Sequence, residues 1–288
     1  MIKGLYALPP DVGAYLARIG LAPEDYRRAM HPELPLSPSD YSVPHTKESL
    51  DCLVHAHLFH IPFENIDGYD LHQEVSLEIP DIFDKIVTRR RGGYCFELNA
   101  LFSALLEALG FSCYAVGQRV LREGAFPPLC HRATVVTLPQ SQERVLCDVG
   151  FGGPSPVTAL YLDRPEVQTS GVLRFRFDTE PVRGLRRTIL VEEAGETPLV
   201  VFSDVPVDPV DFVPVNTYMT YHAKSRFYNN RVMNLMRPGG SVAVDNDVLR
   251  LHENGVLEER PLPDRAALKQ ACIDYFGMNA EALAGLDT

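Results

Sequence analysis

Apolar residues recur every three or four positions along much of the first 110 residues, which is the period of an amphipathic helix. A residue that can cap a helix stands before two of these stretches, at Asp11 and at Thr46. The apolar stripes that follow are Tyr15, Leu16 and Ile19, and then Leu50, Leu53, Val54 and Leu58. We predict one helix at each stripe, separated by an irregular, proline-rich excursion over residues 21–44.

Two further helices are predicted before residue 110. One spans about 81–89, and the other spans 96–109 and ends at Gly110, a typical C-terminal cap. The second helix has an apolar stripe made of Leu98, Leu101, Phe102, Leu105 and Leu109. A stripe of this kind indicates a helix that packs one face against a core.

After Gly110 the pattern changes to short runs rich in Val, Phe and Thr, separated by Gly, Pro and polar clusters. Such runs predict an antiparallel sheet or a small barrel. The predicted strands are 112–116, 132–138, 145–149, 173–177, 188–191 and 199–202.

The last third of the chain mixes both patterns. We predict a helix over 210–221, and a terminal helix that is capped by Asp264 and runs to Phe276. Strands are predicted near 231–235 and 248–252, the second followed by a turn at 253–255. Helices, then strands, then mixed elements predict an α+β chain in two or three lobes.

Composition narrows the class of protein. The chain has 27 Lys and Arg against 38 Asp and Glu, a net charge of −11, which argues against duplex nucleic acid as a partner. We find no apolar run of about 18 residues and no secretory leader, so we expect a cytoplasmic protein without a membrane partner. The six cysteines contain no CxxC pair, and His55, His57 and His60 lack the spacing of a metal site, so no metal is predicted.

The segment 89–99, RRRGGYCFELN, is the most informative for chemistry. Cys95 stands where a glycine-bearing loop enters a helix, and unpaired N–H groups at a helix start favour the nucleophilic thiolate. The arginines at 89–91 would act in the same direction if their heads approach the sulfur. The alternative is a buried core thiol.

Partners for Cys95 can be found on two predicted strands. His131 opens one strand and Asp148 closes the next, so adjacent strand ends can bring both side chains to one rim. A cysteine nucleophile needs a base, and the base needs a carboxylate or amide to hold its tautomer. Cys95, His131 and Asp148 can supply these three roles.

These residues lie within motifs that resemble the arylamine N-acetyltransferase family. The motifs are RGGYCFELN at 91–99, IPFEN at 61–65, His131, DVGFG at 148–152, YLARIG at 15–20 and SRF at 225–227. The resemblance implies three domains: an N-terminal helical bundle (1–110), a central β-barrel (111–205) and a C-terminal α/β lid (206–288).

The resemblance also implies a papain-like triad of Cys95, His131 and Asp148. This triad would work by a ping-pong mechanism, with acetyl-CoA as cosubstrate, an aromatic amine or hydrazine as acceptor, and no permanently bound cofactor. By analogy with the family, an aromatic acceptor pocket is formed by Phe63, Phe151 and Phe227. Glycines near CoA are expected at Gly150, Gly152 and Gly153.

Other functions remain open at this point. The same fold could serve an amide synthase with a carrier-bound acyl donor, and the triad alone would also suit a papain-like hydrolase. A ligand-binding protein with an inert Cys95 is the non-enzymatic alternative. Cys130 departs from the family pattern by placing a second thiol directly before His131.

The acidic net charge makes CoA binding a specific question, because CoA is itself anionic and requires local positive charge or backbone N–H groups. The candidate cations are the arginines at 89–91, together with Lys224 and Arg226. The physiological acceptor, the acyl chain and the oligomeric state are not determined by the sequence.

Overall fold

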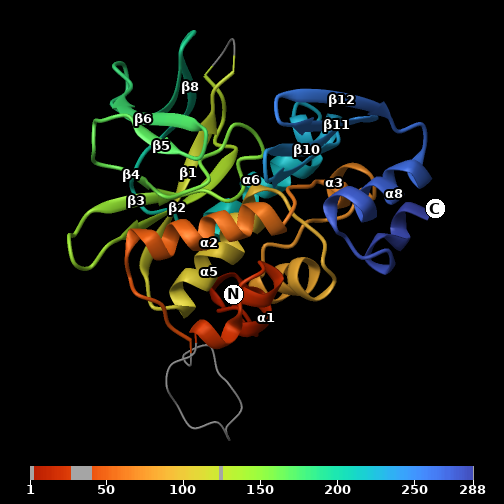
Figure 1. The fold of residues 1–288 in the computed structure, drawn as a ribbon, viewed down its shortest axis with the longest axis horizontal. Helices are drawn as coiled ribbons and strands as arrows, with labels where there is room; N and C mark the ends of the chain where they lie inside the picture. The colour runs from red at the N-terminus through yellow and green to blue at the C-terminus, as the bar shows by residue number, and fades with distance from the viewer. Residues whose placement is uncertain (1–2, 27–40, 123–125, 288) are drawn as a thin grey trace, which may run out of the picture.

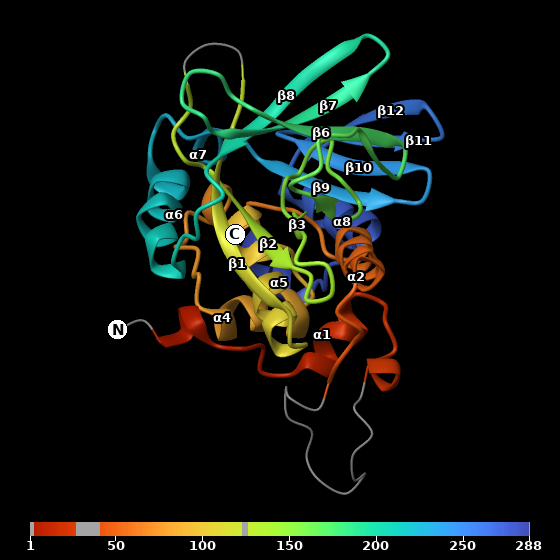
Figure 2. The ribbon, with the colours of Figure 1, turned by 90° about the vertical axis from the view of Figure 1, so that its left-hand side faces the viewer.

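The computed structural model describes residues 3–26, 41–122 and 126–287. Helices form the first lobe, an eight-stranded sheet the second, and a four-stranded sheet with helices the third (Figures 1 and 2). The predicted α+β class is confirmed. Most of the predicted excursion over 21–44 lies outside the described residues, which include only its two ends, with the 3-10 turn η2 (Pro23–Tyr26) in the first of them.

The first two predicted caps are confirmed. The Asp11 side chain accepts a hydrogen bond from the N–H of Ala14 at 2.8 Å and starts α1 (Val12–Arg18). Thr46 accepts a longer one, 3.4 Å, from Ser49 and starts α2 (Lys47–His60). The short segments η1 (Lys3–Tyr6) and α3 (Ile66–Tyr69) were not predicted.

The helix predicted over 81–89 begins earlier and changes form. It starts as α4 (Ile79–Phe83), with Pro80 in its first turn, and continues as a π-helical turn, η4 (Asp84–Thr88). Proline fits the first turn because its missing N–H has no partner there in any helix. The helix predicted over 96–109 is confirmed as α5 (Cys95–Ala108), and all of its residues except Glu107 are buried.

The second lobe is one antiparallel sheet in the order β4-β3-β2-β1-β8-β7-β6-β5. Its strands are β1 (Ser112–Val120), β2 (His131–Thr137), β3 (Arg144–Cys147), β4 (Leu160–Tyr161), β5 (Gln168–Ser170), β6 (Leu173–Thr179), β7 (Arg186–Glu192) and β8 (Gly195–Phe202). All six predicted strands are present, and β1 extends to Val120. The sequence did not predict β4 and β5, which have only two and three residues.

The two edge strands of this sheet, β4 and β5, meet through a side chain. The amide of Gln168 accepts a hydrogen bond from the N–H of Tyr161 at 2.7 Å and donates one to the carbonyl of Tyr161 at 2.8 Å. The sheet is therefore nearly closed into a barrel. Closure protects edge strands that would otherwise present unpaired backbone groups.

The last part of the chain forms a four-stranded antiparallel meander and several helical elements. The strands are β9 (Val232–Arg237), β10 (Gly240–Asp245), β11 (Val248–Glu253) and β12 (Val256–Pro261), and the helical elements are η5 (Pro209–Asp211), α6 (Phe212–Tyr221), α7 (Arg226–Asn229), α8 (Arg265–Phe276) and η6 (Glu281–Asp287). Of these, α8 and η6 pack against the meander, whereas Phe212 and Met219 of α6 lie in the core of the helical lobe. Asp264 caps α8 as predicted, and Asn254 and Gly255 turn β11 into β12 with positive φ angles. The sequence missed β10 and β12.

One extended segment joins the helical and C-terminal lobes near the start of α5. Phe63 exchanges two backbone hydrogen bonds with Asn234 of β9, at 2.8 and 2.9 Å. The same segment pairs with the loop before α5, where the N–H of Glu64 donates to the carbonyl of Gly93 at 2.9 Å. The start of α5 thus lies where the helical and C-terminal lobes meet.

Within the described residues, no helix combines the length and the apolar character needed to cross a bilayer.

Candidate active site

Cys95 is the first residue of α5, and its side chain is almost completely buried. The two preceding glycines allow the chain to pass through a crowded space. A Cβ on Gly92 would lie 2.2 Å from the carbonyl oxygen of Pro62, and one on Gly93 would lie 2.9 Å from a carboxylate oxygen of Glu97. The Gly-Gly pair is therefore required by close packing at the entrance to the helix.

His131 and Asp148 are in direct contact, as their strand ends suggested. Antiparallel pairing of β2 with β3 places Thr134 opposite Cys147, so His131 and Asp148 lie near each other across the pair. The Nε2 atom of His131 lies 2.7 Å from Oδ2 of Asp148, and both side chains are buried.

Asn99 completes this contact, and the sequence analysis did not assign it a role. Its amide nitrogen donates to Oδ1 of Asp148 at 3.0 Å and to the carbonyl of Arg132 at 2.6 Å. Its oxygen accepts the N–H of Val149 at 3.1 Å. The signal was available, because Asn99 stands four residues after Cys95 on the same helix face.

Asp148 is held as a carboxylate. Burial acts to raise its pKa, but His131 and hydrogen bonds from Asn99 and from the N–H of Gly150 lower the pKa below its usual range. An ionised Asp148 accepts the Nε2–H of His131 and leaves the Nδ1 atom with a free lone pair. Nδ1 has no hydrogen-bond partner among the described residues.

Cys95 and His131 line the same cavity, which has a volume of about 240 Å³. The Cys95 sulfur lies 3.8 Å from the carbonyl oxygen of Cys130, and no hydrogen bond joins it to His131 in the described part of the chain. Contacts between catalytic groups are often loose before substrate binds. The thiol and the imidazole therefore face one space, with no hydrogen bond between them.

The resting state of Cys95 differs from the expectation based on the helix start. Burial, the nearby Cys130 and Asp148 raise the pKa of the thiol well above its usual range. The backbone N–H groups of Phe96 and Arg132 lower it, but their effect is smaller. The neutral thiol is favoured, so a thiolate requires a base that accepts the proton.

The three predicted pocket phenylalanines all line this cavity. The rings of Phe63 and Phe227 lie 5.8 Å apart, and the Phe151 ring meets His131 edge-on at 5.6 Å. Aromatic walls of this kind suit a flat, apolar ligand.

The predicted cations divide into two groups. Arg91 turns away from the cavity and is buried against Glu64 and Asp67, and Arg89 pairs with Asp84 at 2.7 Å on the surface. None of the three candidate arginines at 89–91 lines the Cys95 cavity, so the condition that their heads approach the sulfur is not met.

Lys224 and Arg226 do line the cavity, together with Arg122, which the sequence analysis missed. Burial lowers the pKa of Arg122, and the nearby charge of Arg226 lowers it further. We find no carboxylate paired with any of these three cations in residues 3–26, 41–122 and 126–287. The mouth of the cavity is thus cationic in an acidic protein.

The three predicted glycines have different surroundings. Gly150 lines the cavity, and a Cβ there would lie 2.9 Å from the Cα of Cys95. Gly152 has a φ of +68° and packs against the Phe63 ring. Gly152 and Gly153 line a separate, very small cavity of about 10 Å³.

Comparisons with known proteins cover nearly the whole chain. Residues 46–284 match the model of a family described as N-acetyltransferase. The arylamine N-acetyltransferase of Mycolicibacterium smegmatis is 30% identical over 282 residues, which make up 96% of this chain and 95% of that protein.

Solved structures show the same similarity. An N-arylamine acetyltransferase variant from Mycobacterium smegmatis aligns over 96% of both chains, with 28% identity and a TM-score of 0.82. The Mycobacterium marinum arylamine N-acetyltransferase in complex with CoA aligns over 96% of this chain and 98% of that one, with 27% identity and a TM-score of 0.79. Each alignment spans all three lobes.

Proposed function

Because the chain belongs to the arylamine N-acetyltransferase family, we propose that it carries an acetyl group from acetyl-CoA to the nitrogen of an arylamine or arylhydrazine through an acetyl-cysteine at Cys95. The observation that supports this proposal most is the shared cavity of Cys95 and His131, with Asp148 bound to the imidazole at 2.7 Å. The solved CoA complex of a relative supports the choice of donor.

In the first half-reaction, the proton of Cys95 moves to Nδ1 of His131, and the thiolate attacks the thioester carbonyl of acetyl-CoA. The new carbon–sulfur bond forms on Cys95, the bond to CoA breaks, and His131 returns the proton to the leaving CoA sulfur. Asp148 stabilises the imidazolium that exists in between.

In the second half-reaction, the amine nitrogen attacks the acetyl carbon on Cys95. The carbon–nitrogen bond forms, the bond to the Cys95 sulfur breaks, and the amine proton passes through His131 to the sulfur. The enzyme returns to its thiol form. The aromatic walls formed by Phe63, Phe151 and Phe227 would hold the acceptor ring against this centre.

The negative oxygen of each tetrahedral intermediate needs donors close to the sulfur. The backbone N–H groups of Phe96 and Arg132 lie beside the Cys95 sulfur and are therefore close to the carbon that it attacks. We assign them as the candidate oxyanion donors.

The cationic mouth suits the phosphates of CoA. Arg122, Lys224 and Arg226 carry positive charge with no carboxylate partner among the described residues, so an anion can bind there without breaking an ion pair. Contacts of CoA with Gly150, Gly152 and Gly153 stay a prediction, and Gly150 alone lines the cavity.

The test is a thiol-release assay with purified protein. With acetyl-CoA alone, we expect one equivalent of free CoA per Cys95, and we expect continuous release once an arylamine is added. Cys95→Ser should abolish both phases. No release from acetyl-CoA, combined with acylation by a carrier-bound thioester, would instead identify an amide synthase, and peptide cleavage dependent on Cys95 would identify a hydrolase.

A further inference from the structure

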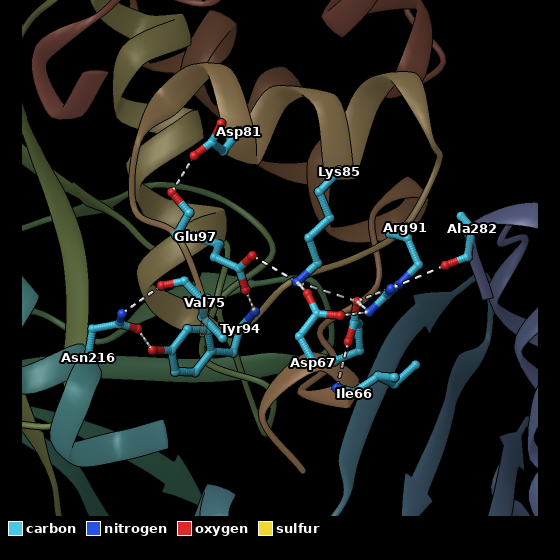
Figure 3. Close-up of polar contacts among 12 residues, drawn as sticks. Ile66, Asp67, Val75, Asp81, Lys85, Arg91, Tyr94, Glu97, Asn216 and Ala282 are labelled. Carbon is cyan, nitrogen blue, oxygen red and sulfur yellow. Dashed lines mark hydrogen bonds and ion pairs between the residues drawn. The ribbon is translucent and has the colours of Figure 1, made fainter. Parts of the chain in front are cut away.

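A cluster of charged side chains lies next to the start of α5 (Figure 3). Its members are Glu64, Asp67, Lys85, Arg91 and Glu97. The ammonium of Lys85 lies 2.7 Å from Asp67 and 2.8 Å from Glu97. Arg91 binds Asp67 and Glu64, both at 2.8 Å, and donates to the carbonyl of Ala282 in η6. No step of the proposed acetyl transfer uses these groups.

Glu97 connects this cluster to the nucleophile. One of its carboxylate oxygens accepts a hydrogen bond from the ammonium of Lys85. The other accepts a hydrogen bond from the backbone N–H of Tyr94 at 3.0 Å. Tyr94 is the N-cap residue of α5 and immediately precedes Cys95. The hydrogen bond to Glu97 therefore fixes the backbone of the residue directly before the nucleophile.

Tyr94 is also held at its other end. Its hydroxyl donates to the side-chain oxygen of Asn216 in α6, and the Asn216 amide donates to the carbonyl of Val75 at 2.8 Å (Figure 3). The Tyr94 ring meets Phe227 edge-on, with ring centroids 5.7 Å apart. Movement of Tyr94 would therefore disturb both Cys95 and one wall of the cavity.

Glu97 must be ionised to make both of its bonds. Each of its oxygens faces a donor, so a proton on either oxygen would break one bond. Burial raises the pKa of Glu97 to about 7, and the adjacent Asp67 and Glu64 add to this rise. The charge of Lys85 opposes it, whereas Arg91 is bound to Glu64 and Asp67.

We propose that Lys85 and Glu97 are positioning residues for Cys95: the ammonium of Lys85 holds one oxygen of the Glu97 carboxylate, and the other oxygen holds the backbone N–H of the N-cap residue of the nucleophile helix. This role rests on the proposed acyl transfer at Cys95. It is a role in geometry, since neither residue lines the cavity that holds Cys95 and His131.

The test compares Glu97→Gln and Lys85→Gln with the wild type, in the rate of Cys95 acetylation by acetyl-CoA in a single turnover. Glutamine at 97 can satisfy only one of the two donors. We expect each substitution to reduce the rate by about tenfold or more, counted per folded molecule as measured by circular dichroism, so that unfolded protein does not contribute. Lys85→Arg keeps the charge and should restore most of the rate.

The double variant separates positioning from independent effects. If Lys85 acts through Glu97, the acetylation rate of the double variant is no lower than that of the slower single variant. Asp70→Asn is the matched control, because Asp70 forms a buried ion pair with Arg231 at 2.6 Å and has no bond to Tyr94. We expect this control to lower the melting temperature and to leave the acetylation rate unchanged.

Two results would decide against these assignments in different ways. If Glu97→Gln and Lys85→Gln acetylate at the wild-type rate per folded molecule and only melt earlier, the pair has no positioning role. If the wild type is not acetylated, the proposed function is wrong, and the rate of Cys95 alkylation by iodoacetamide then provides the same comparison for the positioning pair.

Discussion

The Nε2 atom of His131 lies 2.7 Å from Oδ2 of Asp148, in a pocket where Asn99 and the N–H of Gly150 also donate to the same carboxylate. Three donors on one buried carboxylate keep it ionised. An ionised Asp148 fixes the proton of His131 on Nε2, and Nδ1 is then free to accept the proton of Cys95.

Asp148→Asn should leave the fold intact and remove most of the activity. An amide at this position can present its NH₂ group to His131, which favours the tautomer with the proton on Nδ1. Loss of the correct tautomer in a triad costs on the order of 10³- to 10⁴-fold in kcat. Steady-state kinetics with acetyl-CoA and an arylamine check this, with the far-UV circular dichroism spectrum as the control for folding. A loss of less than tenfold would contradict the role of Asp148.

Asn99→Ala should reduce both stability and activity. The substitution leaves the N–H of Val149 and the carbonyl of Arg132 without their partner and removes one donor from Asp148. A buried polar group that loses its partner costs about 1–3 kcal/mol. Urea denaturation measures the free energy of unfolding, and the single-turnover rate measures the effect on chemistry. Unchanged values in both would show that Asn99 is dispensable.

Neutralising the cations at the mouth of the cavity should weaken the binding of acetyl-CoA. We expect Arg122→Gln, Lys224→Gln and Arg226→Gln each to raise KM for acetyl-CoA about threefold, with little change in kcat, because exposed charges act modestly and additively. Added salt should reduce the differences. Arg89→Gln is the control, since Arg89 lies outside the cavity and pairs with Asp84. Equal KM values for all four variants would show that the three cations at the mouth of the cavity do not contribute to CoA binding.

Acid should destabilise the protein through His57. This side chain is fully buried, its Nδ1 lies 3.0 Å from the hydroxyl of Tyr15, and burial lowers its pKa to about 3. Between pH 6.5 and 3, the unfolded chain binds a proton at this residue and the folded chain does not. Stability is therefore lost as pH falls through this range, by up to about 1.4 kcal/mol per pH unit.

His57→Gln isolates this effect. Glutamine cannot gain a proton, so its free energy of unfolding should fall less steeply than that of the wild type between pH 6.5 and 4.5. Urea denaturation at several pH values gives both curves. Parallel curves would mean that His57 makes no contribution to acid sensitivity.

Local patterns predicted most elements of the fold. The caps at Asp11, Thr46 and Asp264 and the stripe of α5 were readable, because capping and helical spacing depend on neighbours in sequence. The short strands β4 and β5 could not be predicted, because two or three residues are too few to show the alternating pattern of a strand. Their pairing depends on the Gln168 side chain, which meets Tyr161 only in the folded barrel.

The candidate site was predictable in part for the same reason. His131 and Asp148 could be grouped because they stand at the ends of two strands that follow each other. Arg91 could not be placed from its closeness to Cys95 in sequence, because its guanidinium instead binds Glu64 and Asp67 in another segment. Arg122 faces Lys224 and Arg226 only because the barrel and the third lobe meet at this cavity.

The most direct measurement of the central claim is the intact mass of the protein after incubation with acetyl-CoA, with Cys95→Ala alongside. We predict that the wild type gains the mass of one acetyl group, that the variant gains none, and that an added arylamine removes the group as the acetylated amine appears. A wild type that turns over acetyl-CoA and arylamine without this adduct, or a variant that acquires the same adduct, would contradict an acetyl-cysteine at position 95.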